Sequence, residues 1–293
     1  MMSLIRRITL LLFVKVSRFI GKCGLSKFRS ARIAHGFLLR FFKSFLKPEF
    51  VFMHGHKLFL DAQDSSNLSV YGAYEPIETE VLEREINEGD VVLDIGANIG
   101  YYTLIAARLV GNKGKVFAFE PSPDNFALLE KNVAVNGYKN IIPVPKAVSD
   151  ESGKIRLFMD EASGVSNRIH DPGDGRKSIT VEAITLDGFF QDYKGEINFI
   201  KMDIEGAEAR ALQGMRGLLK KNRKIKLATE FYPSALRSSG ATPENYLKSL
   251  SRLGFTINHI DEKNGKFEPV DIEKLMSWVN GGGQITNLFC VRS

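Results

Sequence analysis

The sequence predicts an α/β fold in which a mostly parallel, Rossmann-like sheet carries helices on both faces. From Val91 onward, short apolar segments alternate with longer segments of helical periodicity, which is the pattern of parallel strands joined by crossover helices. The first strand, Val91–Ile95, leads through a glycine-bearing turn directly into a helix, Tyr101–Val110. We therefore expect residues 91–293 to form one domain.

Each element of this domain follows from its local pattern. Seven strands are predicted, mostly parallel with an antiparallel last strand: Val91–Ile95, Lys115–Phe119, Ile141–Val148, Asn198–Met202, Ile225–Glu230, Phe255–Ile260 and Ile285–Val291. The helices between them are expected at Tyr101–Val110, Pro123–Asn136, Glu205–Leu219 and Pro243–Leu253. The stretch Asp261–Gln284 is poor in helical signals, so the last two strands are candidates for a hairpin at the sheet edge.

Two further segments flank or interrupt this pattern. A lead-in segment, residues 49–90, contains a helical pattern at Glu78–Glu88 that Gly89 stops. An insertion between Asp150 and Asp187 holds short strand signals around a polar loop, Asp160–Lys177. Such a loop above the strand ends is a candidate lid over a binding site.

The basic charge of the chain belongs to its N-terminal arm. The formal net charge is +6, yet residues 1–48 contain no Asp or Glu and the remainder is net acidic. Leu4–Ile20 is interrupted by four basic residues and lacks the roughly 18 uninterrupted apolar residues of a membrane-spanning helix. No Ala-x-Ala cleavage site follows, which disfavours a signal peptide.

Residues 1–48 are instead predicted to form a basic amphipathic helical arm with aromatic residues between the basic ones. Two interpretations stay open: the arm binds an anionic membrane surface, or it packs as a helical hairpin on the domain. No nucleic-acid partner is predicted, because no recognised RNA or DNA module accompanies the charge. Cys23 and Cys290 provide neither a disulfide framework nor metal spacing. The expected location is cytoplasmic, with peripheral attachment to the inner face of the membrane as the alternative.

The turn after the first strand describes a nucleotide-like pocket. Asp94 lies at the carboxyl end of the strand, and Glu120 ends the next strand, where it is placed to accept hydrogen bonds from ribose hydroxyls. A dinucleotide fingerprint requires a third glycine between Gly96 and Gly100, but Asn98 stands there. The turn therefore favours a ligand without a pyrophosphate.

Further motifs follow in the order and spacing of a known family. They are Asp94-Ile95-Gly96-Ala97-Asn98-Ile99-Gly100, Glu120-Pro121, Ala147-Val148-Ser149-Asp150, Lys201-Met202-Asp203-Ile204-Glu205-Gly206-Ala207-Glu208 and Glu230-Phe231-Tyr232-Pro233. With these motifs, residues 74–292 resemble the FkbM family of class I S-adenosylmethionine-dependent methyltransferases. The basic arm lies outside the resemblance.

The resemblance implies S-adenosylmethionine as the cofactor and a seven-stranded methyltransferase sheet. Residues expected at the methionine part of the cofactor lie in the first strand and its turn: Asp94, Gly96, Ala97, Asn98 and Gly100. Residues expected at the ribose and the adenine follow the next two strands: Glu120, Ala147 and Asp150. A helix-capping role for Asp94 and a plain turn at Ala147–Asp150 are the structural alternatives.

The acids that end the fourth and fifth strands are the candidate catalytic groups. Asp203 and Glu230 are expected near the acceptor, one of them as a general base or as the group that orients a hydroxyl. Lys201, Asp203 and Glu205 alternate, so they would share one face of an extended strand, and these three with Glu230 form the predicted catalytic set. Glu205 and Glu208 are also expected in the first turn of a helix.

Two alternatives for this chemistry stay open. Asp203 and Glu230 could hold a divalent cation, but nothing at metal-ligand spacing demands one, and no metal is predicted. His170, in the insertion loop, is an alternative base.

The sequence thus predicts methyl transfer to a hydroxyl of a saccharide, a glycolipid or a similar polar metabolite. One alternative is a nicotinamide-dependent oxidoreductase, which Asn98 in place of the middle glycine disfavours. The other is a non-catalytic protein that binds S-adenosylmethionine or acts as a scaffold.

Overall fold

The computed structural model describes residues 48–160 and 166–292, and the chain divides into two compact units, residues 1–74 and 75–293. The predicted helical arm of residues 1–48 lies outside the described residues apart from Pro48. Within the described ranges, no helix is both long and apolar enough to cross a membrane.

The described part of the first unit is a small hairpin followed by a short helix. β1 (Phe50–Met53) pairs antiparallel with β2 (His56–Phe59), and α3 covers Leu68–Tyr71. His54 and Gly55 form the two-residue turn, both with positive φ (48° and 83°). This is the backbone conformation that matches the twist of paired strands in a tight hairpin.

The second unit is built on an eight-stranded sheet. Its strands, in spatial order, are β12 (Lys266–Pro269), β11 (Phe255–Asp261), β13 (Thr286–Arg292), β10 (Lys226–Phe231), β9 (Phe199–Met202), β3 (Val91–Ile95), β4 (Lys115–Phe119) and β5 (Ile141–Val144). The strands from β10 to β5 are parallel, whereas β13 pairs antiparallel with both β10 and β11. The predicted mostly parallel α/β sheet is therefore confirmed, with one strand more than expected.

The extra strand and one extra helix lie in the stretch that the sequence analysis read as poor in helix. β12 forms the sheet edge, and α12 (Ile272–Asn280) follows it, so that reading of Asp261–Gln284 is wrong. Asp271 caps the helix by accepting a hydrogen bond from the Lys274 backbone N–H at 2.7 Å. The last two predicted strands do pair with each other, but β13 lies inside the sheet between β10 and β11.

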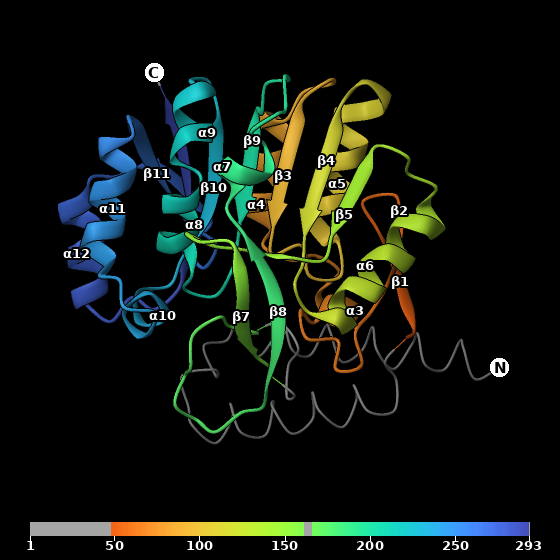
Figure 1. Ribbon diagram of the computed structural model, residues 1–293, viewed down its shortest axis with the longest axis horizontal. Coiled ribbons are helices and arrows are strands. Elements are labelled where there is room, and N and C mark those ends of the chain that lie inside the picture. The colour runs from red at the N-terminus through yellow and green to blue at the C-terminus, as the bar shows by residue number, and fades with distance from the viewer. Residues whose placement is uncertain (1–47, 161–165, 293) are drawn as a thin grey trace. The chain divides into compact units, whose positions relative to one another are not determined.

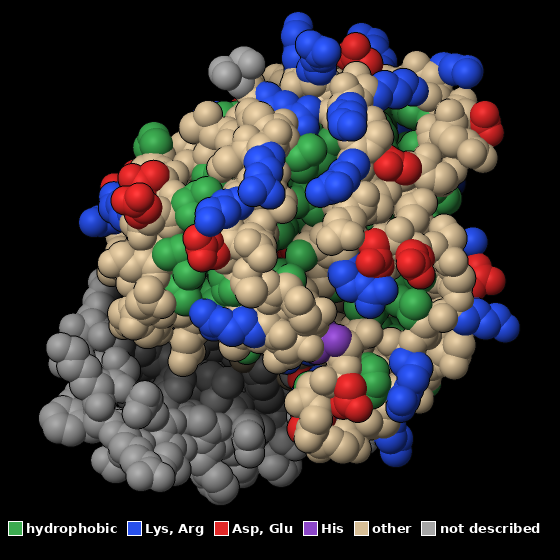
Figure 2. Space-filling view, turned by 60° about the vertical axis from the view of Figure 1, so that its left-hand side comes forward, with side chains coloured by type: hydrophobic (Ala, Val, Ile, Leu, Met, Phe, Trp, Pro, Cys, Tyr) green, Lys and Arg blue, Asp and Glu red, His purple; other side chains and the backbone are tan. Residues whose placement is uncertain are grey.

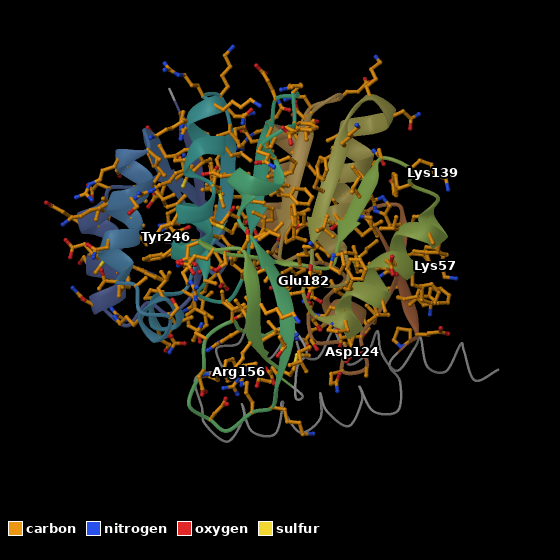
Figure 3. The ribbon with its side chains drawn as sticks, viewed as in Figure 1. Lys57, Asp124, Lys139, Arg156, Glu182 and Tyr246 are labelled. Atoms are coloured by element: carbon orange, nitrogen blue, oxygen red, sulfur yellow. The ribbon has the colours of Figure 1, made fainter. Side chains whose placement is uncertain are left out.

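Helices cover both faces of the sheet, as predicted (Figure 1). α4 (Pro76–Glu85) and α5 (Tyr101–Val110) lie behind it, and α7 (Leu186–Phe189), α8 (Glu208–Gly214) and α9 (Arg216–Lys221) lie in front. The remaining helices are α6 (Pro123–Asn136), α10 (Pro233–Ser238) and α11 (Pro243–Arg252). Tyr246, on α11, is buried, and its hydroxyl lies 2.8 Å from the Thr229 hydroxyl of β10 (Figure 3).

The helix predicted at Glu205–Leu219 is two helices, broken at Met215, and the first begins only at Glu208. Glu205 has a left-handed backbone (φ 56°) outside any helix, so its predicted place in the first helical turn is wrong. The Glu208 side chain explains the turn, because one of its oxygens accepts hydrogen bonds from the backbone N–H groups of Ile204 and Gly206. This carboxylate closes the turn and starts the helix.

The insertion forms a second, three-stranded sheet in the order β6 (Ala147–Val148), β8 (Ser178–Ile184), β7 (Gly153–Phe158). The segment predicted as one strand at Ile141–Val148 is therefore split between two sheets. β7 and β8 extend beyond the carboxyl ends of the parallel strands (Figure 1), and Arg156 and Glu182 lie on this pair (Figure 3). Residues 161–165 of the candidate lid lie outside the described residues.

Close packing between the insertion and α8 gives a test of this arrangement. A Cβ atom at Gly214 would lie 2.0 Å from the Ser149 carbonyl oxygen. Replacing glycine with alanine in a helix usually stabilises it by about 1 kcal/mol. We expect the opposite for Gly214→Ala, a loss of about 1–3 kcal/mol in the free energy of unfolding, measured by urea denaturation.

The control for this measurement is Gly281→Ala. Gly281 has φ −77°, and its Cβ would lie 3.4 Å from the nearest heavy atom, an ordinary contact. We expect a change within about 0.5 kcal/mol. A Gly214→Ala protein as stable as the control would contradict the described packing.

Candidate active site

The glycine-bearing turn is tied directly to the acid that ends β4. One oxygen of Glu120 accepts a hydrogen bond from the Asn98 backbone N–H at 2.9 Å, and the other accepts from the Ser122 N–H at 2.8 Å. Asn98 has positive φ (51°), which turns its N–H toward the carboxylate. Burial raises the pKa of Glu120 to about 7, while these backbone donors favour the ionised form.

Gly96 allows the turn after β3 to lie in close contact with the backbone of Asp203. A Cβ there would lie 1.9 Å from the carbonyl oxygen of Asp203, and Gly96 also has positive φ (85°). The turn after β3 therefore packs against the segment after β9. Any larger residue at position 96 would separate the two.

Asp94 is fully enclosed between β3 and α5. Its carboxylate accepts hydrogen bonds from the hydroxyl and the backbone N–H of Thr103, in the first turn of α5, so the helix-capping alternative for Asp94 also has support. Burial raises the pKa of Asp94 to about 6, the Thr103 hydrogen bond and the Lys201 charge lower it, and the Asp203 charge raises it. Asp94 therefore belongs to the same electrostatic group as the residues that follow β9.

Lys201 is the centre of this group. Its side chain is 2% exposed, and its ammonium nitrogen lies 3.3 Å from Glu78 and 3.5 Å from Asp203. Tyr102 connects Glu78 to Glu75, since its hydroxyl lies 3.0 Å and 2.9 Å from their carboxylates. The pKa of Lys201 is raised although burial alone lowers it, because the surrounding acids outweigh the loss of hydration.

Sequence reasoning missed Glu78, whereas the family resemblance placed Glu75 among residues that close over the cofactor, which stays a prediction. Glu78 is completely buried on α4, where it also accepts a hydrogen bond from Asn287 at 3.1 Å. A signal existed, because Glu78 lies three and four residues before Val81 and Leu82 and so shares their buried face. Burial, together with the Glu78 charge, raises the pKa of Glu75 to about 7.

The predicted acids beyond β9 and β10 do come together. Asp203, Glu205 and Glu230 each have a carboxylate oxygen within 4.8 Å of the other two. Glu205 reaches the group through the left-handed turn instead of an extended strand, and its carboxylate lies 3.3 Å from Arg168 of the insertion. Burial first, and then the charges of Asp203, Glu205 and Glu208, raise the pKa of Glu230.

The remaining predicted residues have structural contacts of their own. Ala147 packs in the small apolar cluster of the second sheet, with Leu157, Val181 and Ala183. Asp150 forms an ion pair with Arg210 at 2.8 Å. Burial raises the pKa of Asp150, but the bond from Arg210 outweighs it and the net shift is downward. A position beside an adenine stays a prediction for both residues.

His170 lies half-buried in the insertion. Neither ring nitrogen has a hydrogen-bond partner among the described residues. Burial, together with the charges of Arg168 and Arg176, lowers its pKa. Its role as an alternative base stays a prediction.

Acidic and basic side chains gather at opposite edges of the large sheet. Figure 2 shows Lys and Arg side chains gathered at the top of the face it presents. The top is the edge where the parallel strands begin, so the acidic residues lie at the other edge of the sheet (Figure 1). The site therefore suits a ligand with positive charge.

The buried lysine allows a direct test. Lys201→Met leaves Glu78 and Asp203 without their cation, and we expect it to lower the free energy of unfolding by about 3–5 kcal/mol at pH 8. Adding Glu78→Gln to Lys201→Met should restore part of the loss. Urea denaturation of the three proteins measures both effects.

The matched control is Lys226→Met. Lys226 pairs with Glu85 at 3.0 Å, with the two side chains 30% and 21% exposed. This partly solvated pair should contribute about 1 kcal/mol or less. Equal losses for the two lysine variants would contradict the proposed importance of the buried cluster.

Curated relatives resemble parts of the chain. Over 143 residues the chain is 33% identical to the hexuronic acid methyltransferase AglP of Haloferax volcanii, which covers 47% of this chain and 55% of that protein. Over 95 residues it is 36% identical to the 31-O-demethyl-FK506 methyltransferase FkbM of Streptomyces tacrolimicus, covering 32% of this chain and 36% of that protein. The chain thus spans about half the length, or less, of these relatives.

Among solved structures, one similar chain is a SAM-dependent methyltransferase from Aquifex aeolicus. It is 18% identical, with a TM-score of 0.42, over 78% of this chain and 93% of that chain. A putative rRNA methylase from Clostridium thermocellum is 11% identical, with a TM-score of 0.45, over 74% of this chain and 95% of that one.

The sequence model of the FkbM methyltransferase domain matches residues 94–257, which is more than half of the chain. The match begins at Asp94 and includes Glu120, Asp203 and Glu230, the acids that the fold gathers at one edge of the sheet. The predicted resemblance is confirmed, and the chain belongs to the FkbM methyltransferase family.

Proposed function

We propose that the protein transfers a methyl group from S-adenosylmethionine to a hydroxyl of a saccharide, a glycolipid or a comparable polar metabolite. The observation that carries the proposal is the row of acids at the carboxyl ends of β3, β4, β9 and β10, with the Asn98 turn hydrogen-bonded to one of them. This edge is where open α/β sheets bind ligands.

The residues fit the cofactor at the places where its chemistry needs acceptors. Glu120 accepts two backbone hydrogen bonds and one from the Asn125 side chain, and a carboxylate has about four acceptor positions, so acceptor capacity is left for a ribose hydroxyl. Asp94, Asp203 and Glu230 supply negative charge for an ammonium and a sulfonium. When bound, the cofactor supplies a methyl group already activated by positive sulfur.

Asp203 is the better placed of the two predicted bases. Its side chain is 24% exposed, so a substrate can reach it, whereas Glu230 is buried to 8% exposure. Lys201 lies 3.5 Å from Asp203 and supports its negative charge. We assign Asp203 the proton of the acceptor hydroxyl, and we assign Lys201 a positioning role.

A cavity of about 620 Å³ at the same edge of the sheet is a suitable acceptor site, since ligand pockets of this size are typical. Its walls come from Glu75, the turn after β11 and the loop that leads into β13. Glu75 and Asn287 line it and also hydrogen-bond to the Lys201 cluster, through Tyr102 and Glu78 respectively. Because β11 runs parallel to β10, this cavity lies at the same edge as Glu230.

The names of two relatives support an oxygen acceptor. One is a methyltransferase of a hexuronic acid, and the other is a 31-O-demethyl-FK506 methyltransferase. A polar acceptor also suits the cavity, whose lining includes Asn264, Gln284 and Thr286. A nicotinamide oxidoreductase is not favoured, since Asn98 uses its backbone N–H on Glu120 where a dinucleotide would need glycine.

The proposed ribose contact gives the first test of this function. Glu120→Gln removes the charge from the acceptor, and we expect S-adenosylmethionine to bind roughly tenfold or more weakly, measured by calorimetry. Glu182→Gln is the matched control, because Glu182 is 62% exposed and pairs with Lys146 on the surface. Unchanged affinity in Glu120→Gln would remove Glu120 from the cofactor site.

The second test concerns transfer itself. The full chain is incubated with methyl-labelled S-adenosylmethionine and with separate polysaccharide, lipid and small-metabolite fractions of its host. We expect label in the polysaccharide or glycolipid fraction, and a loss of roughly 100-fold or more in Asp203→Asn at a saturating concentration of S-adenosylmethionine.

Asp192→Asn is the control for the transfer assay, because Asp192 is exposed in the loop after α7. Label found only in protein would overturn the substrate class. An Asp203→Asn protein with full activity would overturn the assignment of the base.

A further inference from the structure

Three carboxylates converge from two segments at the carboxyl edge of the sheet, the turn after β9 and the end of β10. Asp203 follows β9, Glu205 lies in the left-handed turn, and Glu230 lies near the end of β10. One oxygen of each lies within 4.8 Å of the other two. Oxygen ligands of an octahedral Mg²⁺ lie roughly 3–4 Å apart, given metal–oxygen distances of about 2.1 Å. Small side-chain movements would therefore place all three on one ion.

The protein's own cations compensate this group only in part. Arg168 lies 3.3 Å from Glu205, and Lys201 lies 3.5 Å from Asp203. Lys201 is shared, because Glu78 is closer to it than Asp203 is. Among the described residues, no basic side chain forms an ion pair with Glu230. One carboxylate of the three is therefore left without a positive partner.

Glu230 is the observation that points to a ligand. It is 8% exposed, and its Oε2 atom has no hydrogen-bond donor among the residues that the structure describes. Asn287 is its register partner on β13, yet the Asn287 amide donates to Glu78 instead. A buried carboxylate oxygen without a donor costs free energy unless a proton or a cation occupies the position.

Glu208 fixes the backbone turn around Glu205 but is not one of the three converging carboxylates. One of its oxygens holds the turn on either side of Glu205 through the Ile204 and Gly206 N–H groups. Its other oxygen is also buried and has no donor within the described chain. The turn that presents Glu205 is thus fixed by a further acid, which adds to the negative charge around the group.

We propose that Asp203, Glu205 and Glu230 together bind one hard divalent cation of the Mg²⁺ or Mn²⁺ type. All three donors are carboxylate oxygens, a set that favours these ions over Zn²⁺, which prefers nitrogen and sulfur ligands. The cation balances the unpaired charge of Glu230. Its catalytic role rests on the proposed function: the cation orients the acceptor hydroxyl, while Asp203 binds the ion through one oxygen and keeps the other for the hydroxyl proton.

Mn²⁺ is the probe for the experiment, because its electron paramagnetic resonance signal separates free from bound ion. The full chain, treated with a chelator and dialysed, is titrated with Mn²⁺ in the absence of S-adenosylmethionine. We expect one bound ion per chain, displaced by excess Mg²⁺. Glu230→Gln should weaken the binding by roughly 100-fold or more.

Two further variants keep the result interpretable. Glu205→Gln is the second ligand variant, for use if Glu230→Gln fails to fold by circular dichroism, and it should also weaken Mn²⁺ binding. Glu244→Gln is the matched control, since Glu244 is 51% exposed and pairs with Lys248 on α11. No bound Mn²⁺, or equal Mn²⁺ binding by the control and both ligand variants, overturns the metal site.

A transfer assay in EDTA separates this proposal from the proposed function. Full methyl transfer in EDTA, without Mn²⁺ binding, leaves the function standing and overturns the metal site. One Mn²⁺ bound per chain through Glu205 and Glu230, without methyl transfer to any acceptor fraction, supports the site and overturns the function. Transfer that falls at least tenfold in EDTA and returns with Mg²⁺ supports both.

Discussion

The buried ammonium of Lys201 is the interaction on which the rest of the site depends. A cation at 2% exposure is tolerated only where acids surround it, and its partners come from different elements: Glu78 from α4, Asp94 from β3 and Asp203 from the end of β9. These elements must dock correctly for the charges to balance. The same requirement holds α4 against the carboxyl edge of the sheet, where Glu75 lines the cavity and accepts a hydrogen bond from Tyr102.

The succession of strands and helices along the chain could be predicted because parallel βαβ units leave a strong sequence pattern. That pattern also places Asp94, Glu120, Asp203 and Glu230 at one edge, since each ends a parallel strand. The location of these acids could therefore be predicted without knowing any side-chain contact. The family motifs added the expected ligand chemistry, but not the contacts within the protein.

The parts that could not be predicted depend on tertiary contacts. Glu78 reads as one polar residue in an amphipathic helix, and only its docking against β9 shows that it neutralises Lys201. Glu205 follows a strand and precedes a helix, so its pattern favours either one, whereas Glu208 pulls the backbone into a left-handed turn. α12 was missed because its buried positions, Leu275 and Val279, are few and its flanks are rich in glycine.

The structure gives Gly96 a different role from the one that its sequence motif suggests. In the sequence it indicates that backbone must approach a ligand, but its missing side chain makes room for the Asp203 carbonyl. The turn that would hold the cofactor and the segment that carries the proposed base are therefore in direct contact. Asn98 and Glu120 extend the same connection toward β4.

The position of β13 makes one end of the sheet fold late. This strand lies between β10 and β11, although both precede it along the chain, so β11 and β12 cannot join the sheet until Thr286–Arg292 has left the ribosome. Asn287 arrives with it and supplies the hydrogen bond to Glu78. A nascent chain that lacks these residues therefore exposes β10 as an open sheet edge, and its Glu78 carboxylate lacks one of its hydrogen-bond donors.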